Sequence, residues 1–229
     1  MYQGPTNTNA GLLAVVPKIA GIVALVRLVS TTLPPDAAIG WQIALVLALV
    51  TMTVGNVCAL WQRNIRRLLA YSSIAHAGYM LIGLAVGLAS PNMGGIAAML
   101  FYLAVYALAS LGTFAALTYL SSQRHEVSDM SELSGLARSH PWIAGAIAVC
   151  MFSMAGIPPL AGFWGKLALF SGAIRLAISN SGGVSTWFLL LAIVAALNAA
   201  TAAAYYLRVV GTMYFRPATS APPAEGGPG

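Results

Sequence analysis

Long apolar segments separated by short polar connectors form the dominant pattern of this chain. Six segments are at least as long as the roughly 20 helical residues needed to cross a hydrocarbon core about 30 Å thick. They cover residues 11–30, 39–61, 68–89, 96–120, 142–178 and 186–210. Gly, Pro, Ser and Asn are frequent in the connectors, as is typical of turns. The pattern predicts an all-α integral membrane protein with six transmembrane helices.

The fifth segment, residues 142–178, is nearly twice as long as one crossing requires. It contains two adjacent prolines, Pro158 and Pro159, which interrupt helical hydrogen bonding. We therefore predict two half-helices with a break between Gly156 and Gly162. Discontinuous helices of this kind mark ion and substrate sites in transporters. The alternative is one tilted, kinked helix with an extension on the membrane surface.

The composition agrees with a membrane protein. Hydrophobic residues make up 59% of the 229 residues and charged residues only 7%, against about 25% charged residues in soluble domains. The net charge of +6 does not indicate nucleic-acid binding, because most basic residues lie at or near the ends of apolar segments. Cys58 and Cys150 both lie inside apolar segments and indicate neither a disulfide framework nor a metal site.

The distribution of arginines predicts the topology. They occur in the second and fourth connectors, at the end of the sixth segment and in the tail: Arg63, Arg66, Arg67, Arg124, Arg138, Arg208 and Arg216. The first, third and fifth connectors contain no Lys or Arg. The positive-inside rule then places both chain ends on the cytoplasmic side of the membrane. Residues 1–216 form the transmembrane domain, and residues 217–229, mostly Pro, Gly, Ala and Ser, are predicted to be disordered.

Two lysines lie inside the predicted membrane segments. Lys18 follows Pro17 in the first segment, and Lys166 follows the predicted break in the fifth. A lysine near the centre of a membrane helix costs about 3 kcal/mol or more, so such residues are rare and usually functional. None of the six segments contains Asp or Glu, so neither lysine has a carboxylate partner there. We predict that both lysines bind and release protons; the alternative for Lys18 is a structural lysine that reaches the cytoplasmic interface.

The third segment contains an intramembrane histidine, His76, which can relay protons. Ser72, Ser73 and Tyr79 lie three or four residues from it and share its helical face. A histidine that simply hydrogen-bonds between helices is the alternative.

Two further polar stripes follow helical spacing. One comprises Tyr102, Tyr106, Ser110 and Thr113, and the other comprises Asn198, Thr201, Tyr205 and Arg208. Such side chains either hold helices together or line a hydrated path through the bundle. Neither a phosphate-binding glycine loop nor a metal-ligand cluster nor a nucleophile motif occurs in the chain. We therefore expect no cofactor, no metal and no redox centre on this chain.

Two long motifs resemble the antiporter-like subunits of respiratory complex I. One is GNVCALWQRNIRRLLAYSSIAHAGY, residues 55–79, and the other is SMAGIPPLAGFWGK, residues 153–166. The likeness extends over residues 11–216, and the Ser-Ile-Ala-His pattern that ends in His76 is most similar to the N subunits, equivalent to mitochondrial subunit 2. The resemblance implies that the six segments are helices eight to thirteen of fourteen, with the last five forming one inverted repeat.

The resemblance also implies roles for individual residues. Lys18 would be the lysine of the eighth helix, His76 the histidine of the tenth, and Lys166 the terminal proton site in the broken twelfth. Polar side chains would support this proton relay: Ser72, Tyr79, Tyr106, Thr201 and Tyr205. The glutamate and broken-helix lysine of the family's first repeat have no counterpart here. The resemblance is therefore compatible with a fragment, a split-gene product or a truncated chain.

The functional hypothesis is a proton-translocating membrane subunit of NADH:quinone oxidoreductase. It would act as part of an enzyme complex, with other membrane subunits and lipid as partners and no nucleic acid. The alternative is a subunit of a multi-subunit Na⁺/H⁺ antiporter or membrane-bound hydrogenase, since these relatives share the broken helix and its lysine. A third interpretation is a structural half that serves only assembly.

Overall fold

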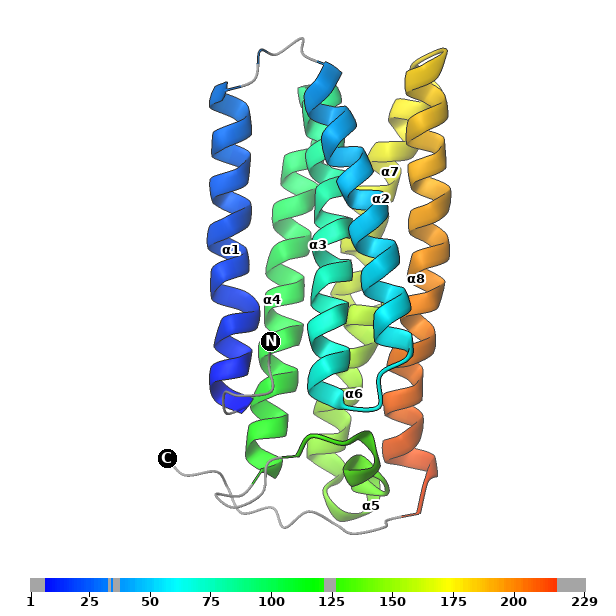
Figure 1. Ribbon diagram of the computed structural model, residues 1–229. Coiled ribbons are helices and arrows are strands. Elements are labelled where there is room, and N and C mark those ends of the chain that lie inside the picture. The colour runs from blue at the N-terminus through cyan, green and yellow to red at the C-terminus, as the bar shows by residue number, and fades with distance from the viewer. Residues whose placement is uncertain (1–6, 33, 35–37, 122–126, 218–229) are drawn as a thin grey trace.

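A computed structural model of the chain describes residues 7–32, 34, 38–121 and 127–217. The long helices lie side by side in one bundle (Figure 1). They are α1 (Asn7–Thr32), α2 (Ala38–Leu60), α3 (Ile65–Ala89), α4 (Gly95–Leu120), α6 (Pro141–Ala155), α7 (Ala161–Ser179) and α8 (Gly183–Phe215). Short helices lie in the connectors: η1 (Pro91–Met93), η2 (Met130–Leu133) and α5 (Leu136–Ser139). Six of the long helices are apolar and long enough to cross a membrane, which confirms the all-α membrane fold.

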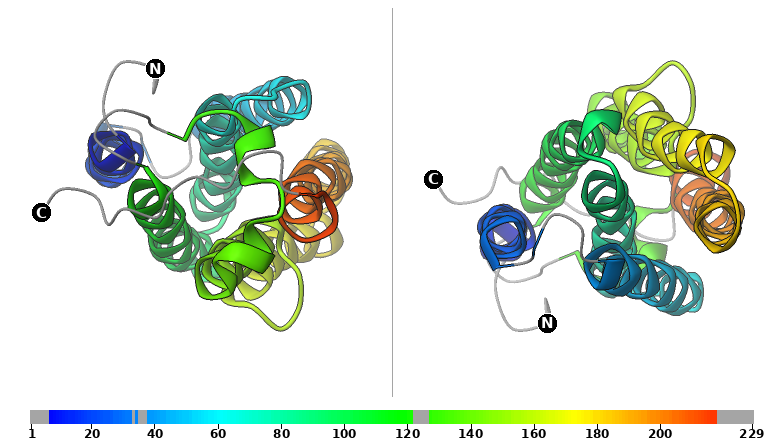
Figure 2. Two further views of the ribbon diagram at one scale, coloured as in Figure 1. Left: turned by 90° about the horizontal axis from the view of Figure 1, so that it is seen from below. Right: turned by 90° about the horizontal axis from the view of Figure 1, so that it is seen from above.

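Helix α3 is the central element of the bundle. It packs against α2, α4 and α7, while α1 lies at the edge, mainly against α4 (Figure 2). Helices α2 and α3 approach closely at Gly55, where an added Cβ would lie 2.5 Å from the backbone nitrogen of Ala75. On the polar face of α3, Tyr79 contacts Asn56 of α2, and His76 contacts Tyr206 of α8.

One end of the bundle carries the structured connectors. Residues 127–139, which precede α6, fold back under α3, where Ile65 N donates to Ser128 O at 2.9 Å and Met130 N donates to Arg63 O at 3.0 Å. The first long helix begins and the last one ends at this same end (Figure 1). The arginines of the described connectors gather here, in the arrangement on which the topology prediction depends. Arg124 and residues 218–229 of the predicted disordered tail lie outside the described residues.

The N-terminus of α3 depends on one capping side chain. Asn64 Oδ1 accepts hydrogen bonds from the backbone nitrogens of Arg66 and Arg67, at 3.0 and 3.1 Å. These amides have no acceptor within the helix, so the cap stabilises the central helix where it begins.

Replacing this cap is expected to destabilise the protein. Asn64→Ala should lower the free energy of unfolding by about 1 kcal/mol, the usual value for a lost N-cap. Thermal unfolding of the purified protein in detergent measures the loss. Ser90→Ala is the matched control, because Ser90 precedes η1 without a side-chain capping bond. An equal loss in both variants would contradict the assignment of the cap.

Candidate functional site

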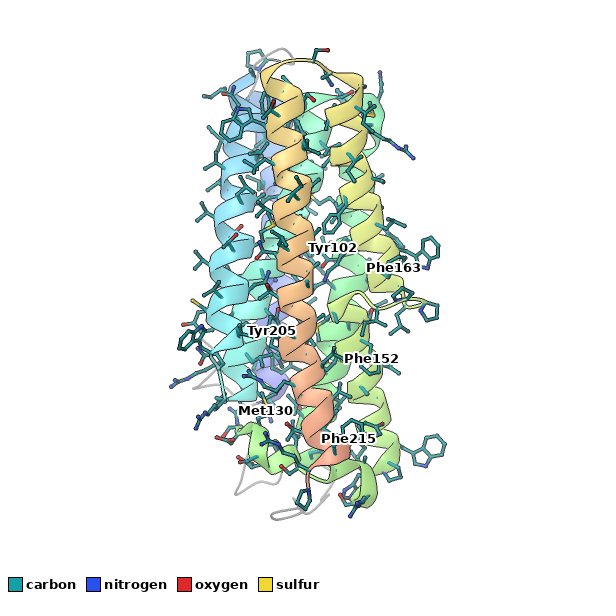
Figure 3. All side chains as sticks on the ribbon, turned by 90° about the vertical axis from the view of Figure 1, so that its right-hand side faces the viewer. Tyr102, Met130, Phe152, Phe163, Tyr205 and Phe215 are labelled. Carbon is teal, nitrogen blue, oxygen red and sulfur yellow. The ribbon has the colours of Figure 1, made fainter. Side chains whose placement is uncertain are left out.

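The fifth predicted segment is two helices, as its length and prolines predict. Helix α6 ends at Ala155, and Gly156 follows it with a φ of 87°, a left-handed conformation that suits glycine. Helix α7 begins at Ala161, and the Pro158–Pro159 peptide bond between the helices is cis. The break therefore ends at Leu160, slightly earlier than predicted, so Gly162 already belongs to α7. Figure 3 shows the break at mid-height of the bundle, between the labelled Phe152 and Phe163.

Lys166 lies one turn into α7 and folds back onto the end of α6. Its Nζ donates to the carbonyl oxygens of Met154 at 3.0 Å and Ala155 at 2.8 Å. These carbonyls belong to the last turn of α6, which lacks amide partners and carries partial negative charge. The Tyr79 ring supplies a further contact, 5.0 Å from Nζ to the centroid. The break thus provides the buried ammonium group with backbone acceptors in place of a carboxylate.

Gly162 allows the two half-helices to meet. A Cβ at this position would overlap the carbonyl oxygen of Ser153 in α6. Its backbone nitrogen also donates to Ser153 Oγ at 3.3 Å. The close contact holds the first turn of α7, and with it Lys166, against the end of α6.

His76 lies at the centre of the bundle and is 1% exposed. Its Nδ1 is 2.6 Å from Tyr102 Oη of α4, and its Nε2 is 2.9 Å from Tyr206 Oη of α8. A neutral imidazole donates from one nitrogen and accepts at the other, and a phenol can do either. Both tautomers of His76 therefore keep two hydrogen bonds. The site can take up a proton on one ring nitrogen and release one from the other.

Lys18 approaches the same centre from α1. Its Nζ donates to Ser73 of α3, at 2.7 Å to the carbonyl oxygen and 2.5 Å to Oγ. The ammonium also lies over the Tyr106 ring, 4.1 Å from its centroid, and that ring lies 4.7 Å from the His76 ring. The side chain points into the bundle towards α3, which disagrees with a lysine that reaches the cytoplasmic interface.

The three predicted relay residues are thus joined by tyrosine side chains. We call this set the polar axis: Lys18, Tyr106, His76, Tyr102, Tyr206, Tyr79 and Lys166. Tyr79 completes it, because its ring lies 6.0 Å from that of His76 and faces Lys166. Every polar contact of the two lysines given above is a carbonyl, a hydroxyl or an aromatic ring. The axis therefore runs across the bundle, from α1 through α3 to α7.

The other predicted polar residues take different positions. The hydroxyl of Ser72 donates to Leu69 O and that of Thr201 to Leu197 O, each at 3.0 Å within its own helix. Tyr205 does not contact His76 through a hydrogen bond; its hydroxyl donates to Asn56 Oδ1 at 3.0 Å. Among the described residues, no group of three His, Cys, Asp or Glu side chains is placed to hold a metal ion.

Sequence reasoning missed two residues of this region. Tyr206 lies next to Tyr205, outside the chosen helical stripe, and only the crossing of α3 and α8 shows that it contacts His76. Asn56 is fully buried in α2. An asparagine inside an otherwise apolar membrane segment is a sequence signal that would have identified it.

Comparison with known proteins shows which proteins the chain resembles. The family model for "NADH:quinone oxidoreductase/Mrp antiporter, TM" matches residues 1–196. NADH-quinone oxidoreductase subunit N 2 of Roseiflexus castenholzii is 42% identical over 226 residues, covering 97% of this chain and 43% of the relative. Subunit N of Rhodospirillum rubrum is 38% identical over 219 residues, covering 96% of this chain and 42% of the relative.

Solved structures share the fold. A chain of respiratory complex I from Thermus thermophilus with bound aureothin matches with a TM-score of 0.73 and 34% identity, over 97% of this chain and 47% of that one. A chain of the Mrp complex from Dietzia sp. matches with a TM-score of 0.76 and 25% identity, over 90% of this chain and 36% of that one. This chain therefore spans less than half the length of these relatives.

Proposed function

Because the chain belongs to the NADH:quinone oxidoreductase/Mrp antiporter family of transmembrane proteins, we propose that it is part of a proton-translocating membrane subunit. The complex would be a respiratory NADH:quinone oxidoreductase, and the subunit would correspond to subunit N, as the names of its relatives suggest. The observation that carries the proposal is the polar axis, which places two lysines and a histidine in a bundle otherwise suited to hydrocarbon.

The geometry supports a proton relay along this axis. Lys18 holds a proton at Nζ against Ser73 on one side of the bundle. His76 accepts a proton on one ring nitrogen and gives one up from the other, towards Tyr102 or Tyr206. Lys166 then holds the proton at the end of α6, where its Nζ donates to two carbonyl oxygens. Waters or hydroxyl groups would complete the steps between these residues.

The environment follows from the same proposal. Redox energy would come from other subunits, and this chain would carry no redox chemistry of its own. Its outer surface is apolar, with Leu108, Trp142 and Ile178 largely exposed, and would contact lipid or neighbouring membrane subunits. The arginine-bearing end, where α1 begins and α8 ends, would face the cytoplasm of a bacterial inner membrane.

A cation/proton antiporter is the second candidate. It is favoured by one observation, the TM-score of 0.76 against a chain of the Mrp complex. The two candidates predict different driving reactions, since an antiporter exchanges ions without electron transfer.

Purification of the intact complex distinguishes these functions. The full-length subunit, tagged at its natural locus, should co-purify with NADH:quinone reductase activity. After reconstitution into vesicles, NADH oxidation by quinone should move protons across the membrane. Sodium–proton exchange without quinone reduction would support the antiporter instead. A complex with neither activity would contradict both.

A further inference from the structure

A pair of buried amides lies beside the polar axis and is not part of it. Asn56 of α2 and Asn198 of α8 meet at 3.0 Å, between Asn56 Nδ2 and Asn198 Oδ1. Asn56 Nδ2 also lies 3.2 Å from Tyr79 Oη, and Tyr205 Oη lies 3.0 Å from Asn56 Oδ1. On its far side, Asn198 Nδ2 contacts Val194 O at 3.0 Å and Thr53 Oγ1 at 3.2 Å. The amide pair thus links α2, α3 and α8 beside Tyr79, a residue of the polar axis.

The direction of every hydrogen bond in this network follows from one backbone group. The Val194 carbonyl can only accept, so the Asn198 side chain must present its NH₂ to it. Asn198 Oδ1 then faces Asn56, so the NH₂ group of Asn56 must donate to it. The same NH₂ faces Tyr79, which leaves Asn56 Oδ1 to accept from Tyr205. Flipping either amide would place two donors or two acceptors against each other.

This fixed direction has opposite consequences for two tyrosines. Tyr205 must donate its hydroxyl hydrogen to Asn56, which removes that hydrogen from any other role. Tyr79 must accept from Asn56, so its own hydrogen points elsewhere. The Tyr79 ring faces Lys166 Nζ at 5.0 Å and meets the Tyr102 ring edge-on at 6.3 Å. Its hydroxyl hydrogen is therefore left free on a residue of the polar axis.

We propose that Asn56, oriented by Asn198, is a positioning residue that keeps the Tyr79 hydroxyl hydrogen available to the polar axis beside Lys166. This inference rests on the proposed function in proton translocation. Carboxamides do not titrate in the physiological range, so the amide pair orients the hydroxyl group and carries no proton itself. The hydrogen would be donated to a water of the polar axis.

The test is a double-mutant cycle in the intact complex, with the initial rate of proton translocation as the readout. Tyr79→Phe keeps the ring over Lys166 and removes only the hydroxyl group. Asn56→Leu keeps the volume and removes the amide. Each should lower translocation about fivefold, the change expected for one neutral hydrogen bond, and the double variant should be no worse than either. Losses that multiply, or a Tyr79→Phe variant with normal translocation, would overturn the proposal.

An apolar replacement of the network distinguishes the proposed positioning role of the amides from a role in packing alone. Combining Asn56→Leu, Asn198→Leu and Tyr205→Phe removes both amides and the Tyr205 hydroxyl group, so no buried amide is left without a partner. Thermal stability should then approach that of the unmodified complex while translocation stays low. Recovery of translocation would show that the amides serve only packing. Thr53→Val is the matched control and should translocate normally. In this variant Asn198 keeps its hydrogen bond to the Val194 carbonyl oxygen, which fixes the orientation of its amide.

Lys166→Ala, measured in the same vesicles, separates failure of this inference from failure of the proposed function. If Lys166→Ala loses translocation while Tyr79→Phe and Asn56→Leu keep it, the positioning role is wrong and the proposed function stands. If Lys166→Ala also translocates normally, the proposed function is wrong, and the positioning role is wrong with it.

Discussion

Lys166→Ala is expected to reduce the rate of proton translocation to less than about a tenth of that of the unmodified complex, because it removes a positioned proton carrier. Lys166 is the titratable residue at the helix break, and it is 4% exposed. Lys18 is the other lysine of this sequence, and it lies on α1 against Ser73, away from the helix break. Reconstituted vesicles that oxidise NADH with quinone, with a pH-sensitive dye inside, measure the rate.

Arg175→Ala is the matched control for this change. Arg175 lies on the same helix, α7, but its side chain is exposed. Removing a cation there should leave translocation unchanged. Equal losses in both variants would indicate that α7 needs its positive charge in general, which contradicts a specific role for Lys166.

Gly162→Ala is expected to have the largest effect on stability. The new Cβ would overlap the Ser153 carbonyl oxygen, a backbone atom that cannot rotate away. Overpacking typically costs about 1–3 kcal/mol and sometimes more, and this contact should reach or exceed the upper value. The half-helices must separate, which also withdraws Lys166 from the carbonyls of Met154 and Ala155. We expect poor assembly of the subunit and a lower temperature of thermal dissociation.

Gly145→Ala is the control, because it makes the same change in the apolar half-helix α6. Apart from its chain neighbours and the backbone of its own helix, no atom lies within 4 Å of a Cβ at that position. Since alanine favours helix by about 1 kcal/mol over glycine, Gly145→Ala should be neutral or stabilising. If Gly162→Ala assembled as well as Gly145→Ala, the close contact between α6 and α7 would be wrong.

The helices and the break were predictable because membrane helices obey strong length and composition rules. Residues 142–178 were too long for one crossing and contained two prolines, and these facts alone predicted two half-helices. The partners of Lys166 were not predictable in the same way. They are backbone carbonyls of Met154 and Ala155, and they become partners only because α7 folds back against the end of α6.

The polar network shows a second limit of sequence reasoning. Helical spacing groups residues on one helix, but it does not say which helix that face meets. Thr201 and Tyr205 share a stripe, yet Thr201 bonds its own backbone while Tyr205 reaches Asn56. Tyr206 lies outside that stripe and contacts His76, because α8 presents two adjacent tyrosines to different neighbours. Only the packing of α2, α3 and α8 separates these roles.

The central claim is that Lys166 must both hold and release a proton, and Lys166→Arg tests it most directly. An arginine can still donate to the carbonyls at the end of α6 but stays protonated at any physiological pH. The measurement is the number of protons translocated per NADH oxidised by the intact complex. We predict an assembled, thermally stable Lys166→Arg complex with a clearly reduced number. A number equal to that of the unmodified complex would show that Lys166 serves only as a helix cap, and would contradict the claim.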